Sequence, residues 1–251
     1  MKNKIKCLDH GFVKLLNISS AIPRQTDYEE INTGDGTIVF VQEFSADDFD
    51  PAICARISFD NFEEKRTEEQ NMKLVEYLIA HHHTSPLEMT TIWLEFKLPI
   101  FIARQFMRHR MCSYNEVSGR YATLPAEWYI PEVVGGKAKS NKQGQEDNLS
   151  EDAQRLFRNN LDSLCEDSYH QYKIFLAKGV APEHARMFLH LNHYTHYIMK
   201  TDLHNMMHFL ALRLDQHAQI EARVYAQAIY DLLSEYLPET MKLFDKYRRL
   251  Q

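Results

Sequence analysis

Residues 89–121 read MTTIWLEFKLPIFIARQFMRHRMCSYNEVSGRY and carry the clearest structural signals in the chain. Polar and apolar side chains alternate over residues 89–97, which predicts a β-strand with Ile92, Leu94 and Phe96 on one side. Pro99 then stands where a first-turn proline is favoured, so we predict a helix from Ile100 to about Arg110.

The last part of this stretch, residues 108–121, combines Arg, His, Ser, Asn, Glu and Tyr with almost no apolar period. Such a segment is a poor core element, so its polar groups need partners. Between Leu98 and Ala126 four arginines stand against one acid, Glu116, a local charge of +3 in a chain of net charge −6. Gln105 and Arg108 are spaced to share one helix face. Arginine suits phosphate because its planar fork is always charged, but a basic surface patch without a ligand explains the composition equally well.

Upstream of this stretch the sequence predicts one strand and one helix. A turn at Asn32–Gly36 precedes the apolar residues 37–41, a pattern typical of a turn followed by a strand. Thr67 and Gln70 have capping-box spacing, which predicts a helix that ends near the histidines of residues 81–83. His at a helix C-terminus interacts favourably with the helix dipole, and this is our interpretation of His81 and His82.

Helices dominate the C-terminal half of the predicted structure. Ser150 is expected to cap a long helix that Gly179 closes. A short helix is predicted over residues 182–189 and a long helical stretch over about 202–236, interrupted by Pro238. The buried face of the helix that Ser150 caps would comprise Leu161, Leu164, Tyr169, Tyr172, Phe175 and Leu176. The chain is therefore expected to be mixed α and β, with helices around a modest sheet.

Composition excludes several classes of protein. The 251 residues are 44% hydrophobic and 25% charged, as in an ordinary globular chain of one large or two small domains. The net charge of −6 argues against binding of nucleic acid or anionic membranes by bulk charge. Four scattered cysteines fit neither a disulfide framework nor a zinc ribbon and favour a reducing compartment. No signal-peptide pattern and no membrane-length apolar run is found, so we expect a cytoplasmic protein.

Residues 108–121 resemble the signature of the flavin-dependent thymidylate synthases, which reads R-H-R, two residues, S, one, N-E, one, S, one, R-Y. Three further segments resemble the same family: Ile53–Asp60 its early strand-to-loop segment, His81–Glu88 its H-x-[ST]-P-x-E segment, and Leu212–Glu221 its R-x-x-x-H-A-Q segment. The segments at about 24–49 and 135–148 match nothing in that pattern and are expected to be insertions. All nine fixed positions of the signature are matched, by Arg108, His109, Arg110, Ser113, Asn115, Glu116, Ser118, Arg120 and Tyr121.

The resemblance implies a fold and an activity. The fold would be α+β, a twisted and mostly antiparallel sheet flanked by long helices, in a single domain over residues 1–251 that assembles into a homotetramer. The implied enzyme is a methyltransferase that converts dUMP to dTMP. Methylenetetrahydrofolate would supply the one-carbon unit and NADPH the electrons, through bound FAD. The expected partners are thus dUMP, folate and NADPH, without nucleic acid or membrane.

The resemblance also implies roles for individual residues. Arg213 would be catalytic, because it would polarise the uracil ring at N3 and stabilise developing negative charge in place of a nucleophile. None of the four cysteines matches a family nucleophile, and Cys112 is interpreted as a packing residue. The dUMP site would be lined by Gln105, Phe106, Met107, Arg108, Glu116, Val117, Ser118, Gly119, Arg120, Arg186 and Arg213. FAD would be held by Ser58, His83, Ser85, Arg108, His109, Arg110, Glu116, Asp202, Leu203, His204, His208 and His217.

The chain departs from the family at two of these positions. Asp202 and His204 stand where many members carry Asn and Arg. An acid at this place would repel an anionic cofactor.

Other functions remain open on the residues alone. His204 and His208 form H-x-x-x-H, and His190, His193 and His196 recur every three residues, spacings that a metal-dependent hydrolase could use. No Glu lies inside the first pair and no Cys or Asp cluster is nearby, so no metal site is predicted.

Single residues of the site have alternative interpretations as well. Ser118 lacks the G-x-S-x-G elbow of a serine nucleophile, so a substrate hydrogen bond is preferred. Arg186 and Arg213 could be salt-bridge partners only. A nucleotide or RNA binder using residues 108–121 is disfavoured by the acidity of the chain and the lack of an aromatic stacking motif. A yellow colour on purification would separate the flavoprotein from these alternatives.

Overall fold

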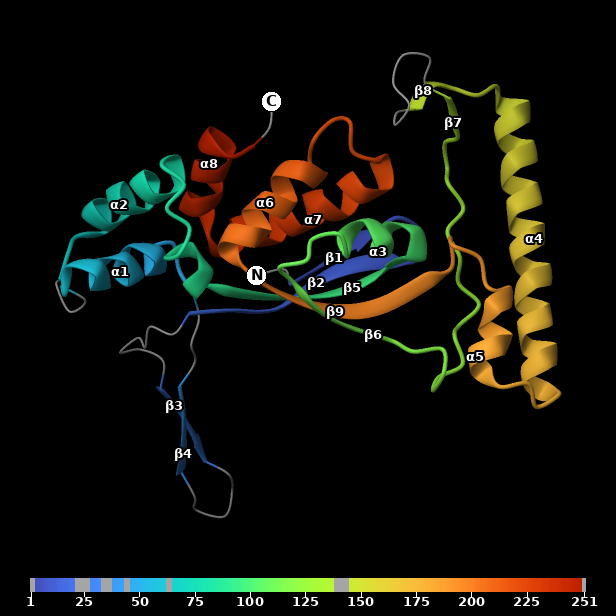
Figure 1. Ribbon diagram of the computed structural model, residues 1–251, viewed down its shortest axis with the longest axis horizontal. Coiled ribbons are helices and arrows are strands. Elements are labelled where there is room, and N and C mark those ends of the chain that lie inside the picture. The colour runs from blue at the N-terminus through green and yellow to red at the C-terminus, as the bar shows by residue number, and fades with distance from the viewer. Residues whose placement is uncertain are drawn as a thin grey trace.

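The computed structural model describes residues 3–20, 28–32, 38–42, 46–61, 65–137 and 145–249 (Figure 1). The strands are β1 (Lys4–Cys7), β2 (Gly11–Ser19), β3 (Tyr28–Asn32), β4 (Ile38–Gln42), β5 (Thr91–Pro99), β6 (Ser113–Glu116), β7 (Gly135–Lys137), β8 (Gln145–Asn148) and β9 (Tyr194–Asp202). The helices are α1 (Asp50–Arg56), α2 (Glu68–Ala80), α3 (Ile100–Phe106), α4 (Glu151–Ala177), α5 (Pro182–Ala185), α6 (Leu203–Arg213), α7 (Ile220–Tyr236) and α8 (Pro238–Tyr247). Short 3₁₀ turns cover Ile57–Phe59, Leu87–Met89 and Arg186–Phe188.

A five-stranded antiparallel sheet in the order β1-β2-β5-β9-β6 forms the centre of the molecule. Alternate side chains of β5, from Ile92 to Leu98, are fully buried, and each contributes about 1.5–3 kcal/mol of hydrophobic stabilisation. The neighbouring strand β9 was not predicted from the sequence, although its buried Tyr197 and Met199 alternate with exposed side chains. Figure 1 shows α3, α6 and α7 over one face of this sheet.

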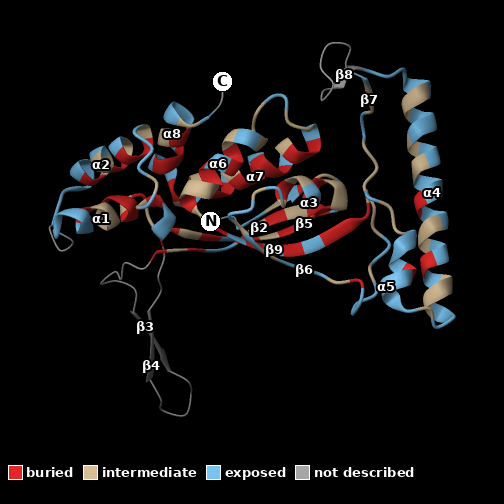
Figure 2. Ribbon diagram, in the orientation of Figure 1, coloured by how far each residue is buried: buried red, intermediate tan, exposed pale blue. Residues whose placement is uncertain are grey.

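The core lies between that face and the helices, as Figure 2 shows by the buried residues of α6 and α7. One close approach there requires glycine. A Cβ built on Gly11 at the start of β2 would lie 1.9 Å from the hydroxyl of Tyr225 on α7. The opposite face of the sheet carries partly exposed apolar side chains, among them Trp93 and Ile198. The predicted α+β fold with a mostly antiparallel sheet flanked by helices is confirmed.

Locally capped helices agree with the sequence. Thr67 caps α2 in a reciprocal capping box with Gln70. Ser150 accepts a hydrogen bond from the amide of Ala153 at the start of α4. Beyond the end of that helix, Gly179 has a positive φ of 84°, which glycine adopts without strain.

Several predicted elements are wrong in extent. Pro99 precedes the first turn of α3, which ends at Phe106 instead of Arg110 because the hydroxyl of Tyr114 takes the Phe106 carbonyl. Residues 202–236 form two helices, since Asp215 accepts from the amide of His217 and turns the chain between them. Pro238 begins a further helix, α8, that was not predicted.

The predicted buried face of α4 is confirmed at Tyr172 and wrong in its other members. Only Cys165 and Tyr172 are buried on this helix, and Leu164 is exposed. The reason is its position, because α4 stands beside the sheet and packs on α5 and residues 186–188 (Figure 1).

Three further segments differ from expectation. Residues 53–59 are helical rather than strand and loop, and Asp60 ends the helical segment. The expected loop after Gly135 contains β7 and β8, with residues 138–144 outside the described residues. In the expected insertion at 24–49, β3 and β4 form a hairpin that extends away from the sheet (Figure 1), and residues 24–27, 33–37 and 43–45 lie outside the description. No helix in the described part of the chain is long and apolar enough to span a membrane.

Candidate active site

Four of the predicted site residues, Gln105, His109, His208 and Arg213, meet where α3 ends beside α6; we call them the arginine–histidine cluster. Arg213 Nε donates to His109 Nε2 at 3.1 Å, and its Nη2 donates to the carbonyl of Gln105 at 2.9 Å. The rings of His109 and His208 meet edge to face at 5.9 Å between centroids. The structure thus joins residues more than a hundred positions apart in the sequence.

The imidazole of His109 is neutral in this cluster. Burial, followed by the charge of Arg213 and the proximity of His208, lowers the pKa of His109 to about 4. Burial also lowers the pKa of Arg213, although an arginine stays charged at every physiological pH. A neutral ring can accept the Nε–H of Arg213, so the pair holds a positive charge without cancelling it.

Two residues that were not assigned to the site hold this cluster in place. The hydroxyl of Tyr114 lies 2.9 Å from the carbonyl of Phe106 and 3.1 Å from that of His109, and so fixes the chain after α3. Gln219 accepts a 2.6 Å hydrogen bond from the Gln105 amide. Tyr114 occupies a variable position of the 108–121 pattern. The spacing of residues in that segment gives no sign of the hydrogen bonds made by the Tyr114 hydroxyl.

A second group of predicted residues lines a cleft of about 170 Å³ at the end of β6, which we call the β6 cleft. Arg186 lines this cleft close to Gly119, where an added Cβ would lie 3.2 Å from the arginine Cδ. Thr195 donates to the carboxylate of Glu116. Lining residues are Ile100, Glu116, Val117, Gly119, Leu124, Arg186, Leu189, Tyr194 and Thr195.

The other arginines of the 108–121 segment, assigned to the dUMP or the FAD site, lie on the surface. Arg120 pairs with Glu183 of α5 at 3.1 Å, and both side chains are about half exposed. Arg108 and Arg110 are exposed, and neither guanidinium forms an ion pair with a residue in the described ranges. Phe106 points into the core, so only its main chain can face a ligand.

Comparison with known proteins identifies the family. A family model described as "Thymidylate synthase complementing protein" matches residues 40–239. The flavin-dependent thymidylate synthase of Wolbachia pipientis wMel is 39% identical over 225 residues, 88% of this chain and 78% of that protein. That of Thermus thermophilus is 44% identical over 195 residues, 77% of this chain and 70% of that protein. The chain belongs to the flavin-dependent thymidylate synthase family.

A solved structure of a known protein has the same fold as this member of the flavin-dependent thymidylate synthase family. The UMP/dUMP methylase PolB from Streptomyces cacaoi, bound with 5-Br dUMP, superposes with a TM-score of 0.79 at 23% identity, over 98% of this chain and 99% of that one. The resemblance noted in residues 108–121 is therefore confirmed, and so is the prediction of an enzyme.

Besides the residues of the 108–121 segment already described, the residues expected to hold FAD lie in three places in this family member. Ser58, His83 and Ser85 are exposed, on the turns that follow α1 and α2. Leu203, His204 and His208 belong to α6, where the side chain of Leu203 is buried and its amide donates to the carbonyl of Thr90 at 2.9 Å. His217 lies apart in the turn after α6 and bonds to Asp215 at 3.0 Å.

The donor set fits an anionic flavin nucleotide. Exposed serine hydroxyls and the guanidinium groups of Arg108 and Arg110 can donate to a ligand, as a diphosphate requires. Asp202, one of the two departures from the family pattern, has a structural role in this fold. Its two carboxylate oxygens accept from the amide and the side chain of Asn205 at 2.8 and 2.7 Å, so Asp202 is the N-cap of α6.

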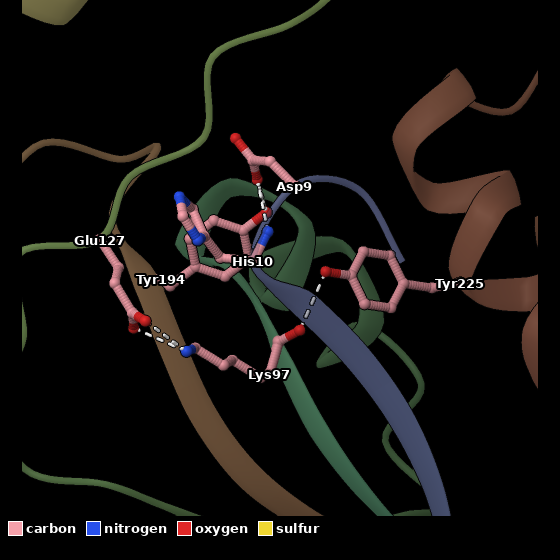
Figure 3. A network of polar contacts seen from close by, with 6 residues as sticks. All are labelled: Asp9, His10, Lys97, Glu127, Tyr194 and Tyr225. Carbon is pink, nitrogen blue, oxygen red and sulfur yellow. Dashed lines mark hydrogen bonds and ion pairs between the residues drawn. The ribbon is translucent and has the colours of Figure 1, made fainter. Parts of the chain in front are cut away.

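A polar network that includes Tyr194 was also missed by sequence reasoning (Figure 3). Tyr194, which lines the β6 cleft, donates to the carboxylate of Asp9, while Lys97 and Glu127 form an ion pair of 2.7 Å. Tyr225 donates to the carbonyl of Lys97 at 2.9 Å. The residues come from segments far apart in sequence, so no local pattern could have found them.

Within the described residues no group of three His, Cys, Asp or Glu side chains could hold a metal ion.

Proposed function

We propose that this enzyme catalyses the reductive methylation of dUMP to dTMP with bound FAD. The overall reaction joins dUMP, methylenetetrahydrofolate, NADPH and a proton to give dTMP, tetrahydrofolate and NADP⁺. When bound, the flavin supplies the reducing electrons as hydride. Family membership and the donor set of the exposed arginines support this assignment.

The observation that carries the proposal is the set of partners around Arg213. Both are neutral, the ring of His109 and the carbonyl of Gln105. No carboxylate pairs with Arg213 among the residues that the structure describes. Two of its five N–H groups are used, so positive charge and donors remain for a substrate. A fixed, half-buried cation suits negative charge that develops on a uracil ring.

The β6 cleft and the exposed arginines would bind the nucleotide. Arg120, Arg186 and Arg108 would donate to the phosphate of dUMP, since a dianion needs several fixed donors. The small Gly119 lets the side chain of Arg186 approach the main chain, and would leave room there for the phosphate. Ser118, Glu116 and Val117 would complete that wall of the site.

We also propose that active sites form between copies of the chain in a homotetramer. The exposed apolar side chains of α4, Leu156, Phe157 and Leu164, support an interface there. In this assembly, Arg108 and Arg110 would face residues that a neighbouring subunit contributes to the same active site. Light scattering of active protein should give the mass of four chains, and an active monomer would contradict the assembly.

An absorbance spectrum tests the proposed function directly. Purified protein should carry, or take up, one FAD per chain and then oxidise NADPH only when dUMP and methylenetetrahydrofolate are present. Product analysis should show dTMP in an amount equal to the NADPH consumed. Protein that binds no flavin from excess FAD, or that oxidises NADPH without forming dTMP, would overturn the proposal.

A further inference from the structure

Arg248, at the end of the C-terminal helix α8, joins two segments that are far apart in sequence. Its Nη1 lies 2.5 Å from Nδ1 of His82, just after α2, and its Nη2 lies 3.3 Å from Nδ1 of His204, in the first turn of α6. Figure 1 shows α8 between α2 and α6. The arginine is half-buried and lies outside the residues 40–239 that match the family.

The chemistry of these contacts determines the state of both histidines. A guanidinium has no acceptor, so each Nδ1 must accept and carry no proton. Both rings are therefore neutral, with the proton on Nε2, on the far side of the ring from Arg248. One arginine thus sets the orientation and the tautomer of His82 and His204 together.

The backbone of His82 indicates that this side chain is used. Helix α2 ends in a Schellman motif, with the amide of His83 bonded to the carbonyl of Leu78 at 2.9 Å and that of His82 to Ile79 at 3.4 Å. His82 occupies the left-handed position of the motif, with φ 57°, where glycine is usual. A side chain there costs on the order of 1 kcal/mol. Its hydrogen bond to Arg248 offsets that strain.

The segments that Arg248 joins both carry residues of the expected flavin site. His83 and Ser85 directly follow His82, and His204 belongs to the turn that Asp202 caps. We propose that Arg248 is a positioning residue, which with His82 and His204 forms a latch between residues 81–89 and the start of α6 in the arrangement that binds the flavin. This inference rests on the proposed function.

Three variants and one control test the latch on the full-length enzyme. Arg248→Ala should weaken FAD binding about tenfold, the loss of roughly one charged hydrogen bond. Arg248→Lys should not restore it, because one ammonium lacks the fork that reaches both rings. Arg249→Ala is the control and should leave FAD affinity unchanged. Arg249 lies next to Arg248, just beyond α8, and pairs with Asp245 of that helix at 2.9 Å. The affinity is measured by titration of flavin fluorescence.

His82→Gly separates positioning from mere stability. Glycine relieves the left-handed strain, so the melting temperature of the flavin-free protein should stay equal or rise, while FAD affinity falls several-fold. Hydrogen exchange of the flavin-free protein should speed up at residues 81–89 and 203–206 in Arg248→Ala, but not in Arg249→Ala. Unchanged FAD affinity in Arg248→Ala or His82→Gly, or an equal loss in Arg249→Ala, would overturn the latch. Wild-type protein that takes up no FAD would instead overturn the proposed function. In that case the hydrogen-exchange measurement still tests the latch, and unchanged exchange rates in Arg248→Ala would refute it.

Discussion

Arg213 and Arg108 belong to the same expected site, yet the chain surrounds them differently. Arg213 is half-buried, with two hydrogen-bond partners supplied by α3 and the turn after it. Arg108 is exposed and forms no ion pair with any residue in the described ranges. The first arginine is preorganised before any ligand arrives, whereas the second gains its partners only on binding.

This difference suggests a division of work. A group that stabilises a transition state must be held rigidly, because reorganisation during the reaction would cost rate. A group that captures a phosphate can lose mobility on binding and still contribute affinity. We therefore expect substitutions in the arginine–histidine cluster to act on kcat, and substitutions of the exposed arginines to act on KM.

The largest effect is expected for Arg213→Ala. Removal of the cation should lower dTMP formation at saturating dUMP by roughly a hundredfold or more, the scale of one oxyanion-type donor. Arg213→Lys should not restore activity, because an ammonium cannot bond to both His109 and the Gln105 carbonyl in the same geometry. Flavin content, followed by absorbance, should remain normal in both variants.

A suitable control is Arg104→Ala, which removes an exposed arginine of α3 that lies outside the predicted site. It should retain near-normal turnover. Near-normal turnover in Arg213→Ala would show that the role given to Arg213 is wrong.

A smaller effect is expected for Arg120→Ala. Loss of one charged hydrogen bond to the phosphate should raise the KM for dUMP about tenfold and leave kcat nearly unchanged. Glu183→Gln removes the ion-pair partner of Arg120 and should leave this KM equal or lower it. Steady-state assays over a range of dUMP concentrations measure both parameters. A fall in kcat without a change in KM would remove the distinction between exposed and preorganised arginines.

The elements that the sequence predicted well are those governed by local contacts. Thr67 with Gln70, and Ser150 with the amide of Ala153, lie three residues apart, so their capping is visible in the sequence. The start of α2 and the extent of α4 follow from such contacts. The central strand β9 was missed, because its role depends on pairing with β5 about a hundred residues away.

The prediction of the site from the sequence is limited in the same way, to what local patterns reveal. The 108–121 signature predicted Glu116, Val117 and Gly119 of the β6 cleft together with Arg108 and Arg110, but not which of these residues are held by the chain itself. Contacts such as Gln105 with Gln219 and Arg248 with His82 span more than a hundred residues and follow no period. Even Asp202, interpreted from the sequence as repelling an anionic cofactor, needed its contact with Asn205 to be recognised as a cap.

Asp202 provides the third prediction, on the scale of about 1 kcal/mol. Asp202→Ala removes the N-cap of α6 and should lower the free energy of unfolding by about 0.5–2 kcal/mol, whereas Asp202→Asn keeps a capping oxygen and should be nearly neutral. Urea denaturation of the flavin-free variants measures this. FAD affinity should be similar in wild type and Asp202→Asn. A much tighter affinity in Asp202→Asn would mean that the carboxylate does repel the cofactor.

The smallest effect concerns the pH dependence contributed by His109. Its pKa falls from an ordinary 6.5 to about 4 in the folded protein, so between these values the unfolded chain binds more protons at this residue. Stability must then decrease as the pH falls below 6.5, and the loss is complete near pH 4. Because the ring is only half-buried, solvent screens the effect, and we expect less than about 1 kcal/mol between pH 7 and pH 6. The slope of unfolding free energy against pH should be reduced in His109→Gln, which retains an acceptor for Arg213 but cannot titrate. NMR of the His109 ring should show a single titration near pH 4. A midpoint near pH 6.5 would mean that Arg213 has a second positive charge beside it at mildly acidic pH. The explanation of the catalytic role of Arg213 by neutral partners would then fail.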